Sequence, residues 1–265
     1  MKIMFWKNKN KITTNHLSAI CFDHFALTDT GIVRDHNEDS LSVIKNIDGN
    51  GGLLAIVADG MGGHAGGEVA SKMAVDIISE YIKRSKQVNE SSLKDAISFA
   101  NKAIYEKAQN ESNLKGMGTT CVVLYASDSK LIWANVGDSR LYQNQEDNLI
   151  QISVDDVFQD DSSGKSHILT QACGTKPKVN VHTGQFTLTE EGLASQFLLC
   201  SDGLYDLVKN DEIRSILNLG SLSFSAELLM GLAKERGGHD NISIILIEAN
   251  TYTTEATTQE IKIRS

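Results

Sequence analysis

The chain has 265 residues, of which 41% are hydrophobic and 22% are charged, and its formal net charge is −9. This composition is typical of folded globular domains and excludes disordered, collagen-like and membrane-embedded classes. The negative charge also argues against a surface that neutralises nucleic-acid phosphates, so we expect neither nucleic-acid nor membrane partners.

The chain is predicted to fold as one unit, because it contains a single proline, Pro177, and no Gly/Ser-rich linker. We predict an exposed N-terminal arm over residues 1–20 that could supply a first strand, one domain over 21–250 and a polar C-terminal tail over 251–265. The arm's apolar run is too short for a signal peptide, and no later segment is long enough to span a bilayer. The four cysteines are dispersed without a CxxC pair, which indicates reduced thiols and a cytoplasmic protein.

Hydrophobic periodicity predicts the elements, with short apolar runs as strands and a three-to-four-residue apolar repeat as helices. In chain order we predict a strand over 53–58, helices over 68–84 and 92–109, strands over 119–125, 131–136 and 197–200, a helix over 225–236 and a strand over 242–247. The first helix is expected to face the core with Val69, Met73, Ile77 and Tyr81, and the second with Leu93, Ile97, Ala100 and Ile104. Several strands are apolar on both faces, so other layers must cover them, and the pattern predicts an α+β fold.

Three apolar strands each run directly into an aspartate, at Asp59, Asp138 and Asp202, and a fourth aspartate, Asp240, precedes the last strand. Any one of these Asp-Gly or Gly-Asp pairs is most often only a turn. Strands of one sheet bring their ends together, however, and four clustered carboxylates repel one another unless a cation neutralises them. Oxygen ligands without a Cys/His set indicate Mg²⁺ or Mn²⁺ and not zinc, while calcium is not excluded by ligand type.

An arginine beside further carboxylates lies in TGIVRDHNED, which supplies Arg34, Glu38 and Asp39. A solvated loop with an internal ion pair is the ordinary interpretation, but arginine also suits bidentate binding of phosphate. The glycine-rich segment DGMGGHAGG lacks the Gly-Lys-Ser/Thr ending of a nucleotide-binding loop. Its His64 could act as a general acid, although a lone loop histidine is usually only solvated.

Six short motifs occur in one order along the chain: TGIVRDHNED, VADGMGGH, GMGTT, ANVGDSR, LLCSDGL and GGHDNIS. Together they resemble the type 2C (PPM) family of metal-dependent protein serine/threonine phosphatases, in its bacterial single-domain form. The resemblance implies that residues 21–250 are a phosphatase catalytic domain. It also implies a four-layer α-β-β-α sandwich of two antiparallel sheets flanked by helix pairs.

The resemblance further implies a centre of two Mn²⁺ or Mg²⁺ ions at one end of the sandwich. Asp59 and the carbonyl of Gly60 would bridge the ions. Asp202 and Asp240 would bind one ion, and Glu38, partly through water, would bind the other.

The remaining roles that the resemblance implies lie around this centre. Asp39 would hold metal-bound waters, Arg34 the substrate phosphate, and Asn241 would support the ligands from outside. In bacterial relatives a third ion is held by residues that match Asp138 and Asp202.

The implied reaction is hydrolysis of phosphoserine and phosphothreonine in proteins by a metal-bridging water, without a covalent intermediate. His64 would protonate the departing oxygen, and Cys200, which follows an apolar run, is interpreted as a core residue and not as a nucleophile. Phosphorylated proteins are the expected partners, a Ser/Thr kinase the expected opponent in signalling, and a monomer the expected state.

Two alternatives remain open, and one motif departs from the family. A pseudophosphatase that serves as a binding module is the first alternative, and a metal-dependent phosphodiesterase or nuclease, disfavoured by the acidic charge, is the second. In many bacterial relatives a long helical flap follows the motif that ISVDDVF (residues 152–158) matches, whereas here only QDDSSGKSH separates it from ILTQACGT. We therefore expect a short, acidic turn at Asp160 and Asp161 in place of the flap, with a consequence for substrate preference.

Overall fold

The structure is a computed structural model that describes residues 17–49, 51–62, 66–145, 148–158, 168–188 and 195–254. The strands are β1 (Leu17–Asp29), β2 (Asp39–Lys45), β3 (Leu53–Met61), β4 (Gly118–Thr119), β5 (Cys121–Ser127), β6 (Lys130–Val136), β7 (Arg140–Gln145), β8 (Asn148–Gln151), β9 (His182–Thr187), β10 (Gln196–Cys200) and β11 (Ile242–Thr254). The helices are α1 (Gly66–Arg84), α2 (Glu90–Asn110), α3 (Asp202–Tyr205), α4 (Asn210–Leu217) and α5 (Leu222–Glu235), with a 3₁₀ turn at Ser112–Leu114.

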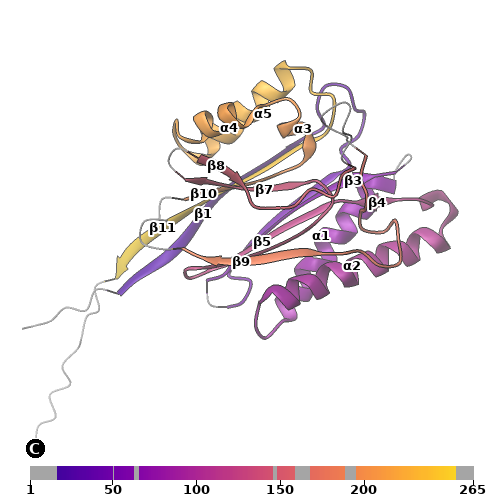
Figure 1. Cartoon of the computed structure of the whole chain (residues 1–265), viewed down its shortest axis with the longest axis horizontal. Helices are drawn as coiled ribbons and strands as arrows, with labels where there is room; N and C mark the ends of the chain where they lie inside the picture. Colours follow the sequence, from indigo (N-terminus) through magenta and orange to yellow (C-terminus); the bar gives the residue numbers. More distant parts are fainter. Residues whose placement is uncertain are drawn as a thin grey trace, which may run out of the picture.

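The described strands form two antiparallel sheets, one in the order β1-β11-β10-β7-β8 and the other in the order β2-β3-β5-β6-β9, with β4 paired to β3. The sheets face each other, α1 and α2 cover the outer face of the second sheet, and α4 and α5 cover the outer face of the first (Figure 1). The expected four-layer α-β-β-α sandwich is therefore confirmed.

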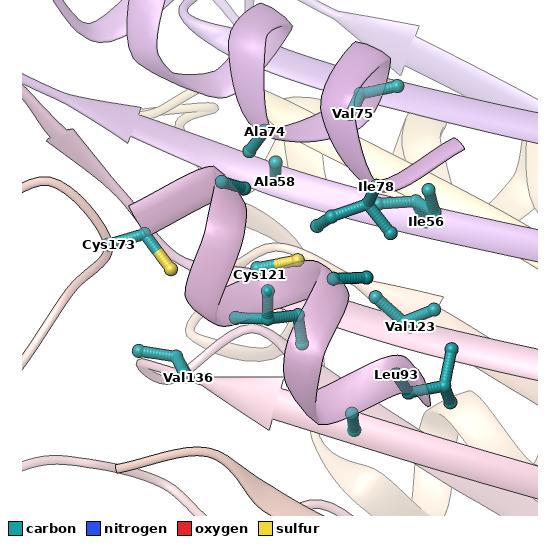
Figure 2. Close-up of a cluster of buried hydrophobic side chains, with 14 of the residues drawn as sticks. Ile56, Ala58, Ala74, Val75, Ile78, Leu93, Cys121, Val123, Val136 and Cys173 are labelled. Atoms are coloured by element: carbon teal, nitrogen blue, oxygen red, sulfur yellow. The ribbon is translucent and has the colours of Figure 1, made fainter. Parts of the chain in front are cut away.

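The strand β3 shows why a run that is apolar at every position forms here. Leu53, Ala55 and Val57 point into the core between the two sheets. The intervening Leu54, Ile56 and Ala58 point into the core beneath α1 and α2, because successive strand side chains alternate between faces. Figure 2 shows Ile56 and Ala58 in this second core, beside side chains of α1 and α2. Every residue from Leu53 to Ala58 is at most 1% exposed, so the strand is buried on both faces.

The first helix packs with a face offset from the predicted one. The fully buried apolar side chains of α1 are Ala70, Ala74, Ile78 and Ile82. The predicted stripe, Val69, Met73, Ile77 and Tyr81, lies one residue earlier and is only partly buried against the same core. Two of the buried positions are alanines, Ala70 and Ala74, which a search for large apolar residues overlooks. In α2 all four predicted core residues are fully buried, which confirms that prediction.

All the predicted strands and helices are present, but the predicted strand over 119–125 is divided between β4 and β5. The break falls at Thr120, whose backbone N–H donates to the carbonyl oxygen of Asp59 at 2.9 Å. Strands β2, β7, β8 and β9 and helices α3 and α4 were not predicted, whereas β1 begins at Leu17, within the arm that was expected to be able to supply a first strand. Strands β1 and β11 pair from Leu17 to Thr254, past the predicted domain boundaries at 21 and 250, and the rest of the predicted arm and tail lies outside the described residues. Within the described ranges, no helix combines the length and the apolar character needed to cross a membrane.

Candidate metal centre

Carboxylates from both sheets gather at one end of the sandwich. Asp39 and Asp59 are direct partners across the β2-β3 pair. Asp202 begins α3, directly after β10 of the other sheet and the intervening Ser201. The expectation that strands of a single sheet would bring the four aspartates together was wrong, since the facing sheets each contribute. Two stacked sheets place the ends of their strands at the same edge, which brings these residues into reach of one another.

The carboxyls of this group raise one another's pKa values. Burial raises the pKa of Asp59 well above its usual range, and the charges of Asp39, Asp202, Asp240 and Asp138 raise it further. Five carboxylates of one sign thus influence one another, and two of them, Asp39 and Asp138, are each only 7% exposed. Such an arrangement is unfavourable unless protons or a cation neutralise it.

The other carboxyls of the group have raised pKa values with the same main cause. Burial raises the pKa of Asp39 to about 6 and the pKa of Asp202 to about 7. The charge of Asp138 is the second cause of the shift at Asp202. Burial also raises the pKa of Asp138 and of Glu38.

Three carboxylate oxygens of the group are buried without a hydrogen-bond partner: Oε1 of Glu38, Oδ1 of Asp39 and Oδ1 of Asp202. The second oxygen of Asp39 accepts a hydrogen bond from the Ser201 hydroxyl at 2.8 Å. A buried, unpartnered carboxylate oxygen is costly, and its presence in a native fold calls for a ligand. Among the described residues no three His, Cys, Asp or Glu side chains converge closely enough to bind one ion. The donor set nevertheless fits a hard divalent cation, because it consists of orphaned anionic oxygens.

Arg34 reaches this cluster from the loop between β1 and β2. Its Nη2 donates to Oδ2 of Asp240 at 2.6 Å, across 206 positions of sequence. The Arg34 side chain is 49% exposed, so much of the guanidinium faces solvent beside the carboxylates. The structure thus brings the arginine and the aspartates together, as the sequence pattern predicted.

Asn241 fastens the Arg34 loop to the start of β11. Its Nδ2 donates to the carbonyl oxygens of Thr30 and His36, both at 2.9 Å, and its Oδ1 accepts from the backbone N–H of Glu38 at 2.8 Å. Its own backbone N–H donates to Oδ1 of Asp240 at 2.8 Å. Asn241 is only 4% exposed, so these bonds form away from water. One side chain therefore holds the segments that carry Arg34, Glu38 and Asp240 in a single arrangement.

Gly60 occupies a position that tolerates no side chain. A Cβ there would lie 2.2 Å from the carbonyl oxygen of Gly67 and 2.4 Å from that of Glu38. At Gly67, a Cβ would lie 2.8 Å from Oε1 of Glu38. The two glycines let three backbone segments approach closely, and this approach seats Glu38 beside β3.

Several parts of the site fall outside the predictions or outside the described residues. Ser201 and Ser243 were not predicted, although the Ser201 hydroxyl bonds Asp39 and accepts from the backbone N–H of Ser243 at 2.9 Å. The signal for Ser201 was its place beside Asp202 in LLCSDGL. The predicted general acid, His64, and the predicted short turn at Asp160 and Asp161 lie outside the described residues.

A family model described as "Protein phosphatase 2C" matches residues 33–241. A serine/threonine phosphatase stp from Listeria welshimeri is 38% identical, over 84% of this chain and 94% of its own length. The crystal structure of the serine/threonine phosphatase Stp1 from Staphylococcus aureus superposes with a TM-score of 0.79 at 32% identity, covering 86% of this chain and 94% of that one. The catalytic domain of the phosphatase PstP, in complex with two manganese ions, superposes with a TM-score of 0.77 at 29% identity, covering 87% of this chain and 99% of that one.

Proposed function

Because the chain belongs to the protein phosphatase 2C family and is a protein serine/threonine phosphatase, we propose that it hydrolyses phosphoserine and phosphothreonine in proteins at the carboxylate cluster. The observation that supports this site is the set of buried, unpartnered oxygens of Glu38, Asp39 and Asp202 beside the half-exposed Arg34. Anionic oxygens suited to a divalent ion thus stand next to a cation suited to phosphate.

Two Mn²⁺ ions are the proposed cofactor, with Mg²⁺ as an equivalent, since the related PstP structure contains two manganese ions. Asp59 and the Gly60 carbonyl would hold both ions, Asp202 and Asp240 one of them, and Glu38 the other. When bound, the ions supply a water nucleophile of lowered pKa and neutralise charge on the phosphoryl group.

The chain's own residues would orient the substrate around this centre. Arg34 has five N–H donors, and the structure engages its Nη2 with Asp240, so the exposed remainder of the guanidinium can bind phosphoryl oxygens. The pair with Asp240 would hold the bound phosphate against the carboxylate cluster. Asp39, fixed by the Ser201 hydroxyl, would accept hydrogen bonds from ordered water through its free oxygen.

No covalent phosphoenzyme is required in this reaction. Cys200 is the cysteine adjacent in sequence to the cluster, but it is fully buried, and burial raises the pKa of its thiol. A buried thiol of raised pKa is a poor nucleophile. We assign the protonation of the departing serine or threonine oxygen to His64, because imidazole titrates near neutral pH.

Further proposals concern the wider setting of the enzyme. A third ion would be held by Asp138 and Asp202, and the charge of Asp138 contributes to the raised pKa of Asp202. The physiological role would be to oppose a Ser/Thr kinase in signalling, with the enzyme acting as a monomer. A cytoplasmic location is consistent with four cysteines that form no disulfide.

Release of phosphate from a phosphothreonine peptide and from p-nitrophenyl phosphate tests the proposal, with Mn²⁺ and with EDTA. Wild-type protein and Asp211→Asn, a control that removes an exposed carboxylate on α4, should turn over only with metal. Asp202→Asn should lose turnover while remaining folded. Folded, Mn²⁺-saturated wild-type protein that releases no phosphate would overturn the proposal and favour a binding module.

A further inference from the structure

Two adjacent aspartates, Asp155 and Asp156, contact the turn that carries Asp138, yet the proposed reaction gives them no role. Oδ2 of Asp156 accepts from the backbone N–H of Gly137 at 2.9 Å, and the backbone N–H of Asp156 donates to the Gly137 carbonyl at 3.0 Å. Gly137 has a φ of +93°, a conformation that favours glycine. Asp156 therefore holds the residue before Asp138 by both its backbone and its side chain.

Asp155 holds the other side of the same turn through Arg140. Nε and Nη2 of Arg140 donate to Oδ2 of Asp155 at 3.0 and 2.7 Å, and both side chains are only 17% exposed. Gln151 Nε2 donates to the second oxygen of Asp155 at 2.7 Å. A guanidinium with two donors on one carboxylate is fixed in direction as well as in place.

Arg140 in turn fixes a tyrosine that joins Asp138 to the helix of Asp202. The guanidinium carbon lies 3.6 Å from the centroid of the Tyr205 ring, a cation–π contact. The Tyr205 hydroxyl donates to the backbone carbonyl of Asp138 at 3.0 Å. Tyr205 and Asp202 are the last and first residues of the single turn α3, so this contact connects the Asp138 turn to Asp202.

We propose that Asp155 and Asp156 are positioning residues that hold the turn at residues 137–140, and with it Asp138, against α3, the helical turn that begins with Asp202. They act through Gly137, Arg140 and Tyr205 and touch neither substrate nor ion. This inference rests on the proposed metal centre. It also explains how two further acidic residues are tolerated near a cluster that is already negative. Asp155 forms an ion pair with Arg140, and Asp156 accepts hydrogen bonds from the Gly137 N–H and from Gln171 and bonds His182.

Equilibrium binding of Mn²⁺, measured by calorimetry and by the electron paramagnetic resonance of free Mn²⁺, tests the proposal without turnover. Asp155→Asn and Asp156→Ala should weaken the ion held by Asp138 and Asp202 about ten- to a hundredfold, the usual effect of removing a residue that orients a ligand. Tyr205→Phe keeps the ring and the fold and removes only the hydroxyl, so it should shift the same ion in the same direction.

Glu212→Gln is the matched control. It breaks another two-donor pair, in which Arg236 Nη1 and Nη2 donate to Glu212 at 2.7 and 2.6 Å, on α4 and just after α5. Its Mn²⁺ isotherm should superimpose on that of the wild type. In turnover assays, excess Mn²⁺ should restore kcat in the three variants near Asp138, while KM for a phosphothreonine peptide stays within about twofold.

Folded Tyr205→Phe and Asp156→Ala proteins whose Mn²⁺ isotherms match the wild type would overturn the proposal, even if their melting temperatures fall, because a merely structural role moves stability alone. A wild type that binds Mn²⁺ but hydrolyses no phosphopeptide would instead overturn the proposed function. The variant isotherms would still decide the role of Asp155 and Asp156 in that case.

Discussion

The replacement Asn241→Ala tests how the Arg34 loop is joined to the carboxylate cluster. It removes the side-chain bonds of Asn241 to Thr30, His36 and Glu38 at a position that is 4% exposed. The backbone N–H of Glu38 would lose its acceptor, and two carbonyl oxygens would lose their donor. The loop that carries Arg34 and Glu38 should then separate from Asp240.

The magnitude follows from the number of bonds lost. Three hydrogen bonds at about 1 kcal/mol each predict a loss of about 3 kcal/mol in the free energy of unfolding. For a domain of this size that loss lowers the melting temperature by about 6–12 °C. Because Glu38 and Arg34 are both displaced, Mn²⁺ affinity and kcat/KM for a phosphothreonine peptide should each fall at least about tenfold.

Asn101→Ala is the matched control for this variant. Asn101 is 1% exposed in α2, where its side chain accepts from the Gly174 N–H at 2.8 Å and donates to the Lys176 carbonyl at 3.2 Å. Its replacement should cost about 2 kcal/mol by the same count and leave Mn²⁺ affinity unchanged. Asn241 has no such role if the folded Asn241→Ala protein binds Mn²⁺ and turns over as the wild type does, or if both variants lose Mn²⁺ affinity equally. Urea unfolding in EDTA and calorimetric Mn²⁺ titration supply the two readouts.

The remaining predictions concern pH, a buried thiol and the helix layer. In EDTA the free energy of unfolding should fall as pH rises from about 4 to about 7. Burial raises the pKa of Asp39 to about 6 and the pKa of Asp202 to about 7. Over this pH range the folded state therefore binds more protons than the unfolded state. Urea unfolding at a series of pH values checks this, and a rise in stability over the window would contradict it. Cys200→Ala should keep metal-dependent turnover in a phosphopeptide assay, since burial raises the pKa of that thiol; a folded but inactive variant would point to a covalent route. Ile78→Ala should lower the free energy of unfolding in urea by about 2–5 kcal/mol, because Ile78 is fully buried between α1 and the sheet. The kcat per folded molecule should not change. A loss below about 1 kcal/mol would contradict the burial of Ile78 in the core.

The sequence predicted structure best where a run of apolar residues shows by itself that a segment is buried. The run over 53–58 could be predicted as a doubly buried strand because every position is apolar. Strand β7 could not, since its buried Gln143 and Asn144 are polar. Their partners, Ser195 at 3.3 Å and Asn218 at 2.9 Å, lie 52 and 74 positions away and leave no local pattern.

The same distinction applies to the candidate site. The aspartates could be found individually, because each stands beside an apolar strand. The aspartates come together because the two sheets pack face to face, and hydrophobic periodicity does not reveal how sheets pack. The bond between Ser201 and Asp39 spans 162 positions, and the side-chain bonds of Asn241 to Glu38, His36 and Thr30 span 203, 205 and 211 positions. Packing determines these contacts, so a motif can indicate the residues but not their partners.

We propose that the carboxylates at the end of the sandwich bind a pair of divalent ions. Anomalous diffraction at the manganese edge, from crystals grown with Mn²⁺, tests it most directly. We expect two peaks that share Asp59, one beside Asp202 and Asp240 and the other beside Glu38, and a third peak beside Asp138 and Asp202. Crystals of Mn²⁺-saturated protein with no peak at Asp59, or with peaks only at other surfaces of the molecule, would contradict it.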